Sequence, residues 1–308
     1  MSERKSLVIG TRGSPLALAQ ANETAARLAQ ALGWPNERFP LDVIRTSGDM
    51  IQDRALSEAG GKGLFTKEID AAQIAGRVDV TVHSAKDLPN DLPDGLVIAG
   101  YLPREDARDA LIARAGASLA DLPRGARVGS ASLRRQALLR RARPDLEVSL
   151  LRGNVGTRLQ KIADGAFDAT LLAMAGLRRL GLTEHVTAPL DVEAFTPAVG
   201  QGAIAIVVRA DDAFATEAVA RILCRETGLR LAAERAFLAV LDGSCRTPIA
   251  GHATLAGERI RLTGLIARPD GSQTIEGERE GMASDAAALG ADLGEELRAR
   301  TPSGFFGD

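Results

Sequence analysis

Residues 79–89 of the chain read Asp-Val-Thr-Val-His-Ser-Ala-Lys-Asp-Leu-Pro. The two valines alternate with polar neighbours and β-branched residues dominate, which is typical of a short strand. Pro89 then takes the chain out of regular strand pairing. The strand thus ends at a group of polar residues, and in open α/β sheets ligands bind at that end of the strands. The alternative is a strand end with a solvated charge pair, Lys86 and Asp87.

A strand, a turn that contains arginine, and a helix follow one another at the start of the chain. Residues 6–11 predict a strand, and Ser14 followed by Pro15 predicts a helix that begins there and covers residues 15–32. Arg12 lies in the turn, beside the free amides of the helix N-terminus, and this arrangement suits an anion. An ordinary turn with an exposed arginine is the alternative.

Two later turns repeat this pattern with more arginines. Ser130 and Ser132 precede a helix whose first turn holds Arg134 and Arg135, a position that disfavours cations unless an anion neutralises them. Two solvated arginines that point in different directions are the alternative. A third strand, turn and helix cover residues 147–164. The arginines at or just after strand ends are Arg12, Arg134, Arg135, Arg152, Arg158 and either Arg178 or Arg179.

The remaining pattern predicts two α/β lobes followed by a small α+β domain. Strands are expected at residues 41–46, 79–82, 97–101, 109–114, 128–129, 147–151, 168–173 and 204–208, and near 249–255, 259–267 and 273–280. Helices are expected at residues 66–75, 118–122, 212–240 and 284–299. We place the first lobe at residues 1–102 with 199–220, the second at 103–198 and the α+β domain at 221–308.

Composition narrows the class of protein. Of the 308 residues, 45% are hydrophobic, 25% are charged and 3% are aromatic, as in a globular protein with aliphatic cores. No apolar run reaches the length of a membrane span, and no signal peptide is recognisable, so we expect a cytoplasmic protein without a membrane partner. In that reducing compartment Cys224 and Cys245 are not expected to form a disulfide.

The arginine-rich turns indicate a substrate with several carboxylates or phosphates. Nucleic acid fits poorly, because the net charge is -2, aromatic residues are scarce and no nucleic-acid motif occurs. Asp87 among these cations could stabilise a developing positive charge or move a proton. Cys245 beside Arg246 could be a reactive thiol, or a buried inert cysteine. The three histidines do not have the spacing of metal ligands.

Long motifs are spread over nearly the whole chain. They lie at residues 11–18 (TRGSPLAL), 60–65 (GGKGLF), 83–89 (HSAKDLP), 104–109 (REDARD), 132–136 (SLRRQ), 151–158 (LRGNVGTR), 197–202 (PAVGQG) and 243–249 (GSCRTPI). In these motifs and in their order the chain resembles the porphobilinogen deaminase (hydroxymethylbilane synthase) family. Several long motifs in the same order are more specific than any one of them.

The resemblance implies a transferase of tetrapyrrole (porphyrin and heme) biosynthesis. Such an enzyme joins four porphobilinogen molecules head to tail into hydroxymethylbilane and releases four molecules of ammonia. It implies a dipyrromethane cofactor that is linked to Cys245 by a thioether. It also implies two lobes like type 2 periplasmic binding proteins, and a third domain that carries the cofactor.

The resemblance also assigns roles to residues, since each pyrrole carries an acetate and a propionate. Asp87 matches the catalytic carboxylate, which would stabilise the azafulvene cation and accept a proton. The implied catalytic residues are Asp87, Arg12, Arg152 and Arg158. The implied cofactor ligands are Cys245, Lys62, Lys86, Ser84, Ser130, Ser132, Arg134, Arg135 and Asp87. The implied substrate ligands are Arg12, Ser14, Phe65, Arg152, Arg158, Arg179 and Gln201.

The chain departs from the family pattern at three positions. Glu58 stands where relatives commonly have lysine, which puts one cofactor or gating contact in doubt. Ser130 replaces a frequent threonine and keeps the hydroxyl, and Ala85 replaces a common methionine. Two other functions stay open: a two-lobed sensor of a small anion, and a thiol enzyme that uses Cys245 on another substrate. We expect a monomer, because no coiled-coil pattern occurs.

Overall fold

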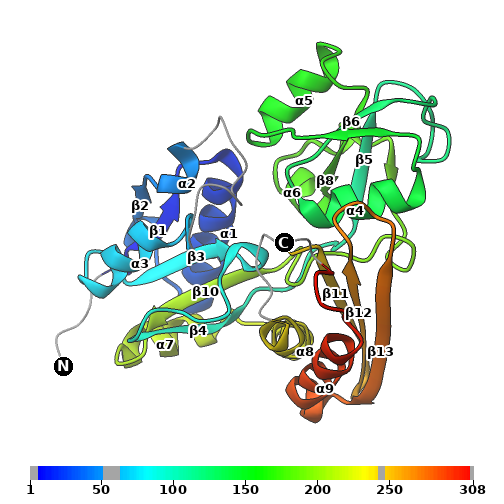
Figure 1. Cartoon of the computed structure of the whole chain (residues 1–308). Helices are drawn as coiled ribbons and strands as arrows, with labels where there is room; N and C mark the ends of the chain where they lie inside the picture. The colour runs from blue at the N-terminus through cyan, green and yellow to red at the C-terminus, as the bar shows by residue number, and fades with distance from the viewer. Residues whose placement is uncertain (1–5, 51–62, 242–246, 306–308) are drawn as a thin grey trace. The chain divides into compact units, whose positions relative to one another are not determined.

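The computed structural model describes residues 6–50, 63–241 and 247–305 (Figure 1). The chain forms two compact units. Within the described residues, the first unit consists of 6–50, 63–105 and 203–228, and the second of 106–202, 229–241 and 247–305. Across the described part of the chain, every helix is too short or too polar to cross a membrane.

The first unit contains a five-stranded sheet in the order β2-β1-β3-β10-β4. Its strands are β1 (Ile9–Arg12), β2 (Leu41–Ile44), β3 (Val80–Ser84), β4 (Leu96–Tyr101) and β10 (Ile204–Arg209). β1 is parallel to β2 and β3, whereas β10 is antiparallel to both β3 and β4. β10, which lies between β3 and the edge strand β4, therefore comes from much later in the chain than either neighbour.

Helices cover both faces of this sheet. They are α1 (Pro15–Leu32), α2 (Ser47–Met50), α3 (Lys67–Ile74) and α7 (Ala213–Ala220), with short 3-10 turns η1 (Asn36–Arg38) and η2 (Ala85–Asp87). The apolar sides of α1 and α7 pack with Val80, Val82 and the isoleucines of β10 in one core. Ile69 and Ala72 of α3 belong to a second, smaller core. Because side chains alternate along a strand, Thr81 and His83 face the α3 side.

The second unit repeats this strand order in a sheet ordered β7-β6-β8-β5-β9. Its strands are β5 (Asp109–Ala113), β6 (Arg127–Gly129), β7 (Glu147–Ser149), β8 (Ala169–Ala173) and β9 (Ala188–Pro189). Its helices are α4 (Leu133–Ala142), α5 (Val155–Ala163) and α6 (Met174–Arg179), with the turn η3 (Thr183–His185). β5 takes the place that β10 has in the first sheet, antiparallel to both of its neighbours.

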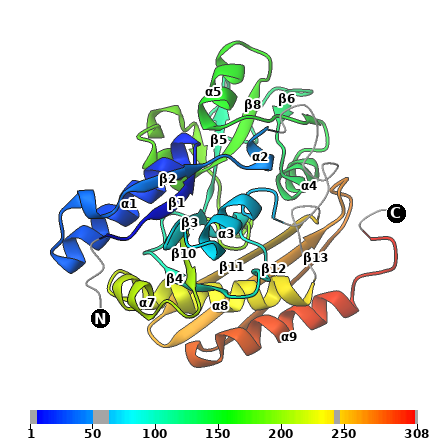
Figure 2. The same ribbon diagram turned by 90° about the vertical axis from the view of Figure 1, so that its left-hand side faces the viewer.

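A three-stranded antiparallel sheet and two helices form the rest of the second unit. The elements are α8 (Arg225–Val240), whose first four residues belong to the first unit, β11 (Ile249–Ala256), β12 (Arg259–Ala267), β13 (Thr274–Met282), η4 (Ala283–Asp285) and α9 (Ala286–Ala299). Helices α8 and α9 run side by side along the sheet (Figure 2). Phe237 of α8 and Leu293 of α9 are fully buried in the core that these helices share with the sheet.

The approach of α9 to α8 depends on glycine. A Cβ on Gly290 would run into the backbone carbonyl of Ala233. We expect Gly290→Ala to lower the free energy of unfolding by about 1–3 kcal/mol, the usual cost of overpacking. Gly228 of α8 has open space around it. Gly228→Ala is the matched control, and urea unfolding should show it unchanged or slightly more stable, since alanine favours helices.

The structure confirms two α/β lobes and an α+β domain, and corrects two helices. Residues 118–122, expected to be helical, form bends and turns. The helix expected over 212–240 is two helices, because the chain between them turns back to the first sheet. There the backbone N–H of Cys224 donates to the carbonyl of Tyr101 at 2.8 Å. The domain boundaries 1–102 with 199–220, 103–198 and 221–308 stay a prediction.

Candidate active site

The first unit carries a small pocket where β1 and β3 end. Its lining comes from the β1–α1 turn, α1, the start of α3 and the end of β3. It brings together five of the residues singled out from sequence: Arg12, Ser14, Phe65, Ser84 and Asp87. Segments that are far apart in the sequence therefore meet at the sheet edge that was predicted to bind a ligand.

A cation, a carboxylate and an aromatic ring form the polar end of this pocket. Arg12 Nη1 lies 4.0 Å from Asp87 Oδ2, and the side chains are 20% and 35% exposed. The guanidinium carbon of Arg12 lies 4.1 Å from the centre of the Phe65 ring, a cation–π contact. A Cβ on Gly48 would lie 2.5 Å from that ring, so glycine there makes room for it. Asp87 thus keeps an accessible carboxylate beside a fixed cation.

Two serines of the pocket have structural partners. Ser14 is the N-cap of α1, and its Oγ accepts a hydrogen bond from the backbone N–H of Ala17 at 3.3 Å, as predicted. Ser84 at the end of β3 lies 2.9 Å from the side-chain nitrogen of Gln20. These contacts hold the β1–α1 turn against the end of β3, and with it the positions of Arg12 and Asp87.

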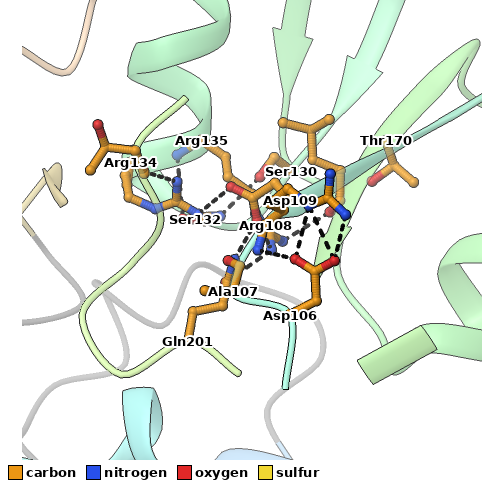
Figure 3. Close-up of polar contacts among 12 residues, drawn as sticks. Asp106, Ala107, Arg108, Asp109, Ser130, Ser132, Arg134, Arg135, Thr170 and Gln201 are labelled. Carbon is orange, nitrogen blue, oxygen red and sulfur yellow. Dashed lines mark hydrogen bonds and ion pairs between the residues drawn. The ribbon is translucent and has the colours of Figure 1, made fainter. Parts of the chain in front are cut away.

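In the second unit, one carboxylate holds two arginines (Figure 3). Asp109, at the first position of β5, is fully buried, and its oxygens lie 2.7 Å from Arg134 Nη2 and 2.6 Å from Arg135 Nη2. Gln201 also donates to Asp109 at 2.9 Å and to the carbonyl of Ala107 at 2.8 Å. Burial alone would raise the pKa of Asp109, but the guanidiniums of Arg134 and Arg135 outweigh it and hold this pKa well below its usual range.

This cluster identifies an anion beside Arg134 and Arg135. Their position in the first turn of α4 was expected to need an anion that neutralises both, and Asp109 supplies a negative charge there. Both arginines are buried, and the alternative of two solvated side chains is wrong. The cluster still has one positive charge in excess, and Arg134 Nε, also buried, has no hydrogen-bond partner in the described structure. An anionic group therefore remains chemically compatible with it.

The serines next to these arginines organise the start of α4. Ser132 is its N-cap and accepts from the backbone N–H of Arg135 at 3.4 Å. Ser130 Oγ accepts from the backbone N–H of Ser132 at 3.2 Å, and its carbonyl accepts from Gln136 at 2.7 Å. The predicted helix start is thus confirmed, and both hydroxyls lie at a helix N-terminus, which favours anions.

The other predicted arginines of the second unit lie nearer its surface. Arg152 and Arg158 are half-buried around the start of α5, and Arg158 Nε donates to the carbonyl of Gly153 at 2.9 Å. Arg179 donates to the carbonyl of Gly202 at 3.2 Å. Arg178, the other candidate in that pair, instead lies 3.3 Å from the carboxylate of Asp106.

Four positions named from the sequence lie outside the described residues: Glu58, Lys62, Cys245 and Arg246. Lys86, in η2 next to Asp87, is half-buried. Gln20 and His83 were not predicted as pocket residues, and Asp109 was not predicted as the partner of two arginines. A carboxylate that opens an otherwise apolar strand was a usable signal for Asp109, because such a group needs a buried cation.

The chain is similar to known proteins in two separate comparisons, one with solved structures and one with sequences. Among solved structures, the chain is similar to the methionine-binding protein MetQ, with 16% identity, a TM-score of 0.44, and 72% of this chain and 89% of that chain covered. It is also similar to an ABC transporter periplasmic substrate-binding protein from Coxiella burnetii, with 14% identity, a TM-score of 0.45, and 71% and 92% covered.

The sequence comparisons cover more of the chain and at higher identity. The family description "Porphobilinogen deaminase, dipyromethane cofactor binding domain" matches residues 7–217, and "Porphobilinogen deaminase, C-terminal domain" matches 229–299. The porphobilinogen deaminase of Nitrobacter hamburgensis is 58% identical over 97% of this chain and 94% of its own length. That of Paracoccus denitrificans is 55% identical over 97% and 95%. The chain belongs to the porphobilinogen deaminase family.

Proposed function

We propose that the chain joins four porphobilinogen molecules head to tail into hydroxymethylbilane and releases four molecules of ammonia. Its membership of the porphobilinogen deaminase family supports this activity, which makes it a transferase of tetrapyrrole synthesis. The observation in the structure that carries the proposal is the pair of Arg12 and Asp87 beside Phe65. This pair offers a cation for a substrate carboxylate and a carboxylate for a developing positive charge.

The side chains that the structure describes suit the dipyrromethane cofactor implied by the family. That group carries acetates and propionates, and it would be linked to Cys245. In the first unit we assign Lys86, Ser84 and Asp87 to it, and in the second Ser130, Ser132, Arg134 and Arg135, with Lys62 from outside the described residues. The positive excess around Asp109 and the capped start of α4 fit its carboxylates. When bound, it supplies the pyrrole on which the product chain grows.

Asp87 has two tasks in this proposal. Its carboxylate stabilises the positive charge that develops on porphobilinogen as ammonia leaves, since a fixed negative group is most effective where charge appears in the transition state. It then accepts the proton that the attacked pyrrole carbon must lose. The Asp87 side chain is 35% exposed, so its carboxylate is accessible both to the developing positive charge and to the pyrrole carbon that loses its proton.

Arginines bind the substrate's acetate and propionate groups. We assign Arg12, Arg152, Arg158 and Arg179 to these carboxylates, because guanidinium groups bind carboxylates in a bidentate manner. Ser14 and Phe65 complete the contacts in the first unit, and Gln201, buried against Asp109, is assigned to the product chain. We further propose that the protein is cytoplasmic, as its membership of a biosynthetic enzyme family supports, and that it is a monomer, as the small net charge of -2 and a sequence without a coiled-coil pattern support.

The intact mass of the purified protein tests the cofactor and its attachment. We expect wild-type protein to exceed the mass of its sequence by two linked pyrrole units, and Cys245→Ala to match its sequence mass. Cys224→Ala is the control, and it should keep the excess because the family motif at residues 243–249 contains Cys245 and not Cys224. If wild-type protein carries no adduct even after incubation with porphobilinogen, and consumes none of it, the proposed function is wrong.

A further inference from the structure

A buried chain of hydrogen bonds leads from α3 to the pocket of the first unit. It starts at Gln73, whose side-chain nitrogen lies 3.1 Å from the carbonyl oxygen of Asp79 and 2.8 Å from that of Val207. Gln73 Oε1 lies 3.0 Å from Thr81 Oγ1, and Thr81 Oγ1 lies 3.0 Å from His83 Nε2. All three side chains are buried, and His83 lines the pocket.

The direction of each hydrogen bond follows from the first one. Because carbonyl oxygens only accept, the Gln73 atom that contacts two of them must be the NH₂ group, which donates both of its protons. Gln73 Oε1 is then an acceptor, so the single proton of the Thr81 hydroxyl is donated to it. The Thr81 oxygen can therefore only accept from His83, and His83 Nε2 carries a proton.

The ring of His83 is also neutral. Burial and, as the smaller cause, the positive charge of Arg12 together lower the pKa of His83 to about 4. A neutral imidazole has one N–H and one acceptor nitrogen. Since Nε2 holds the proton, Nδ1 holds a lone pair.

We propose that Gln73 and Thr81 fix His83 in the Nε2–H form, so that Nδ1 is a permanent hydrogen-bond acceptor that binds an N–H group of the bound pyrrole substrate. His83 is then a binding residue, and Thr81 and Gln73 are positioning residues. This inference rests on the proposed function for the identity of the substrate, and on the hydrogen-bond chain alone for the state of the ring.

A fixed acceptor on His83 gives the pocket a preference among substrate groups that Arg12 does not supply. Porphobilinogen has donors in its pyrrole N–H and its aminomethyl ammonium, and acceptors in its two carboxylates. Nδ1 can accept from either donor but can give nothing to a carboxylate, whereas Arg12 can only donate. His83 therefore binds a donor group of the substrate and Arg12 binds a carboxylate of the same molecule. Together they orient the pyrrole ring relative to Asp87.

The state of the ring can be read without any substrate. The chain has three histidines, so ¹⁵N-histidine labelling gives few signals, and those lost in His83→Asn identify His83. We expect the ¹⁵N shifts and long-range couplings of the holoenzyme to show Nε2–H and unprotonated Nδ1, unchanged from about pH 5.5 to 8. A ring that carries Nδ1–H, or that is doubly protonated near pH 7, overturns the inference.

Two substitutions of His83 separate substrate binding from structural support. Asparagine places its amide group near the position of Nδ1, and glutamine places its amide group near the position of Nε2. We expect His83→Asn to keep kcat/KM for porphobilinogen within about threefold, and His83→Gln to lose about tenfold or more. A purely structural role predicts the reverse order, because glutamine keeps the contact with Thr81. Equal or greater activity of His83→Gln contradicts the proposal.

Thr81→Val tests the positioning residues. Valine keeps the shape but removes the hydroxyl, so we expect the ¹⁵N spectrum to show both tautomers and kcat/KM to fall about three- to tenfold. Thr227→Val is the control: it removes another buried hydroxyl of the first unit, which accepts from the backbone N–H of Arg104, and should change neither readout. An unchanged tautomer in Thr81→Val overturns the inference. If wild-type protein carries the cofactor but makes no hydroxymethylbilane, the proposed function is wrong, whereas the conclusion on the protonation of the His83 ring is unaffected.

Discussion

Replacing Asp87 by asparagine is expected to give a folded protein that carries its cofactor and turns over porphobilinogen roughly a thousandfold more slowly, within the range for loss of a general acid–base group. Asparagine keeps the shape of the side chain but has neither the negative charge that faces Arg12 nor the ability to accept a proton. The rate of porphobilinogen consumption measures the loss, and the intact mass of the same sample shows whether the cofactor is present.

The control for this variant is a nearby carboxylate outside the pocket. Asp91 is exposed and follows Asp87 by four residues. Asp91→Asn removes the same charge from the same segment, so it should keep wild-type turnover if the effect belongs to the position of Asp87. Near-normal turnover of Asp87→Asn would refute the assigned role, and loss of the pyrrole mass would move that role from catalysis to cofactor attachment.

Asp109→Asn is expected to lower the free energy of unfolding of the second unit by about 3–5 kcal/mol, the range measured when one partner of a buried ion pair is removed. Arg134 and Arg135 would remain buried next to a neutral amide. The hydrogen bond from Gln201 would also change, because asparagine has one acceptor oxygen in place of two. Urea unfolding, monitored by a probe in the second unit, measures the difference.

Acid adds an independent measurement of the same carboxylate. The pKa of Asp109 is lower in the folded chain than its ordinary value of 3.8. Its stabilising effect is therefore fully present above that value and is lost as the pH falls towards the folded pKa. Wild-type protein should lose stability in this acid range more steeply than Asp109→Asn. Glu278→Gln, which removes one partner of the exposed pair with Arg261, is the control and should have a much smaller effect.

Local sequence signals were sufficient for most elements of the fold. Ser14 with Pro15 predicted the start of α1, and the helix covers the expected residues 15–32. Alternation in the last third of the chain predicted three strands, which the structure confirms as β11, β12 and β13 and shows to be antiparallel. These signals were reliable because a cap, a turn and a period of two depend on neighbours in the sequence.

The errors arose where distant contacts outweigh local preference. The helix predicted over residues 212–240 runs through 221–224 without a Gly or Pro, yet in the structure the helix is interrupted there. Leu223 packs against Gly100, and the backbone N–H of Cys224 donates to the carbonyl of Tyr101. The pairing of Asp109 with two arginines joins β5 to α4 across at least 25 residues. A local sequence pattern does not predict which distant carboxylate forms an ion pair with a buried arginine.

For the pocket, the sequence predicted the ends of the strands but not the side chains behind them. Arg12 and Asp87 were identified because they follow strands, and the structure places them together. His83 was visible as a polar residue in the quoted strand. Its state depends on Gln73, which reaches it through Thr81 from another element. Such a relation requires three-dimensional structure.

The place of β10 between β3 and β4 fixes an order of events during synthesis on the ribosome. β4 pairs with β10 alone, yet about 100 residues separate Tyr101 from Ile204, and translation takes about 5–20 s to add them. Meanwhile β3 and β4 each present an open strand edge, which is prone to aggregation. All strands of the second sheet are made before β10. The strands β1 to β4 must therefore remain in an incomplete sheet until β10 has been synthesised, whereas the second sheet can already form.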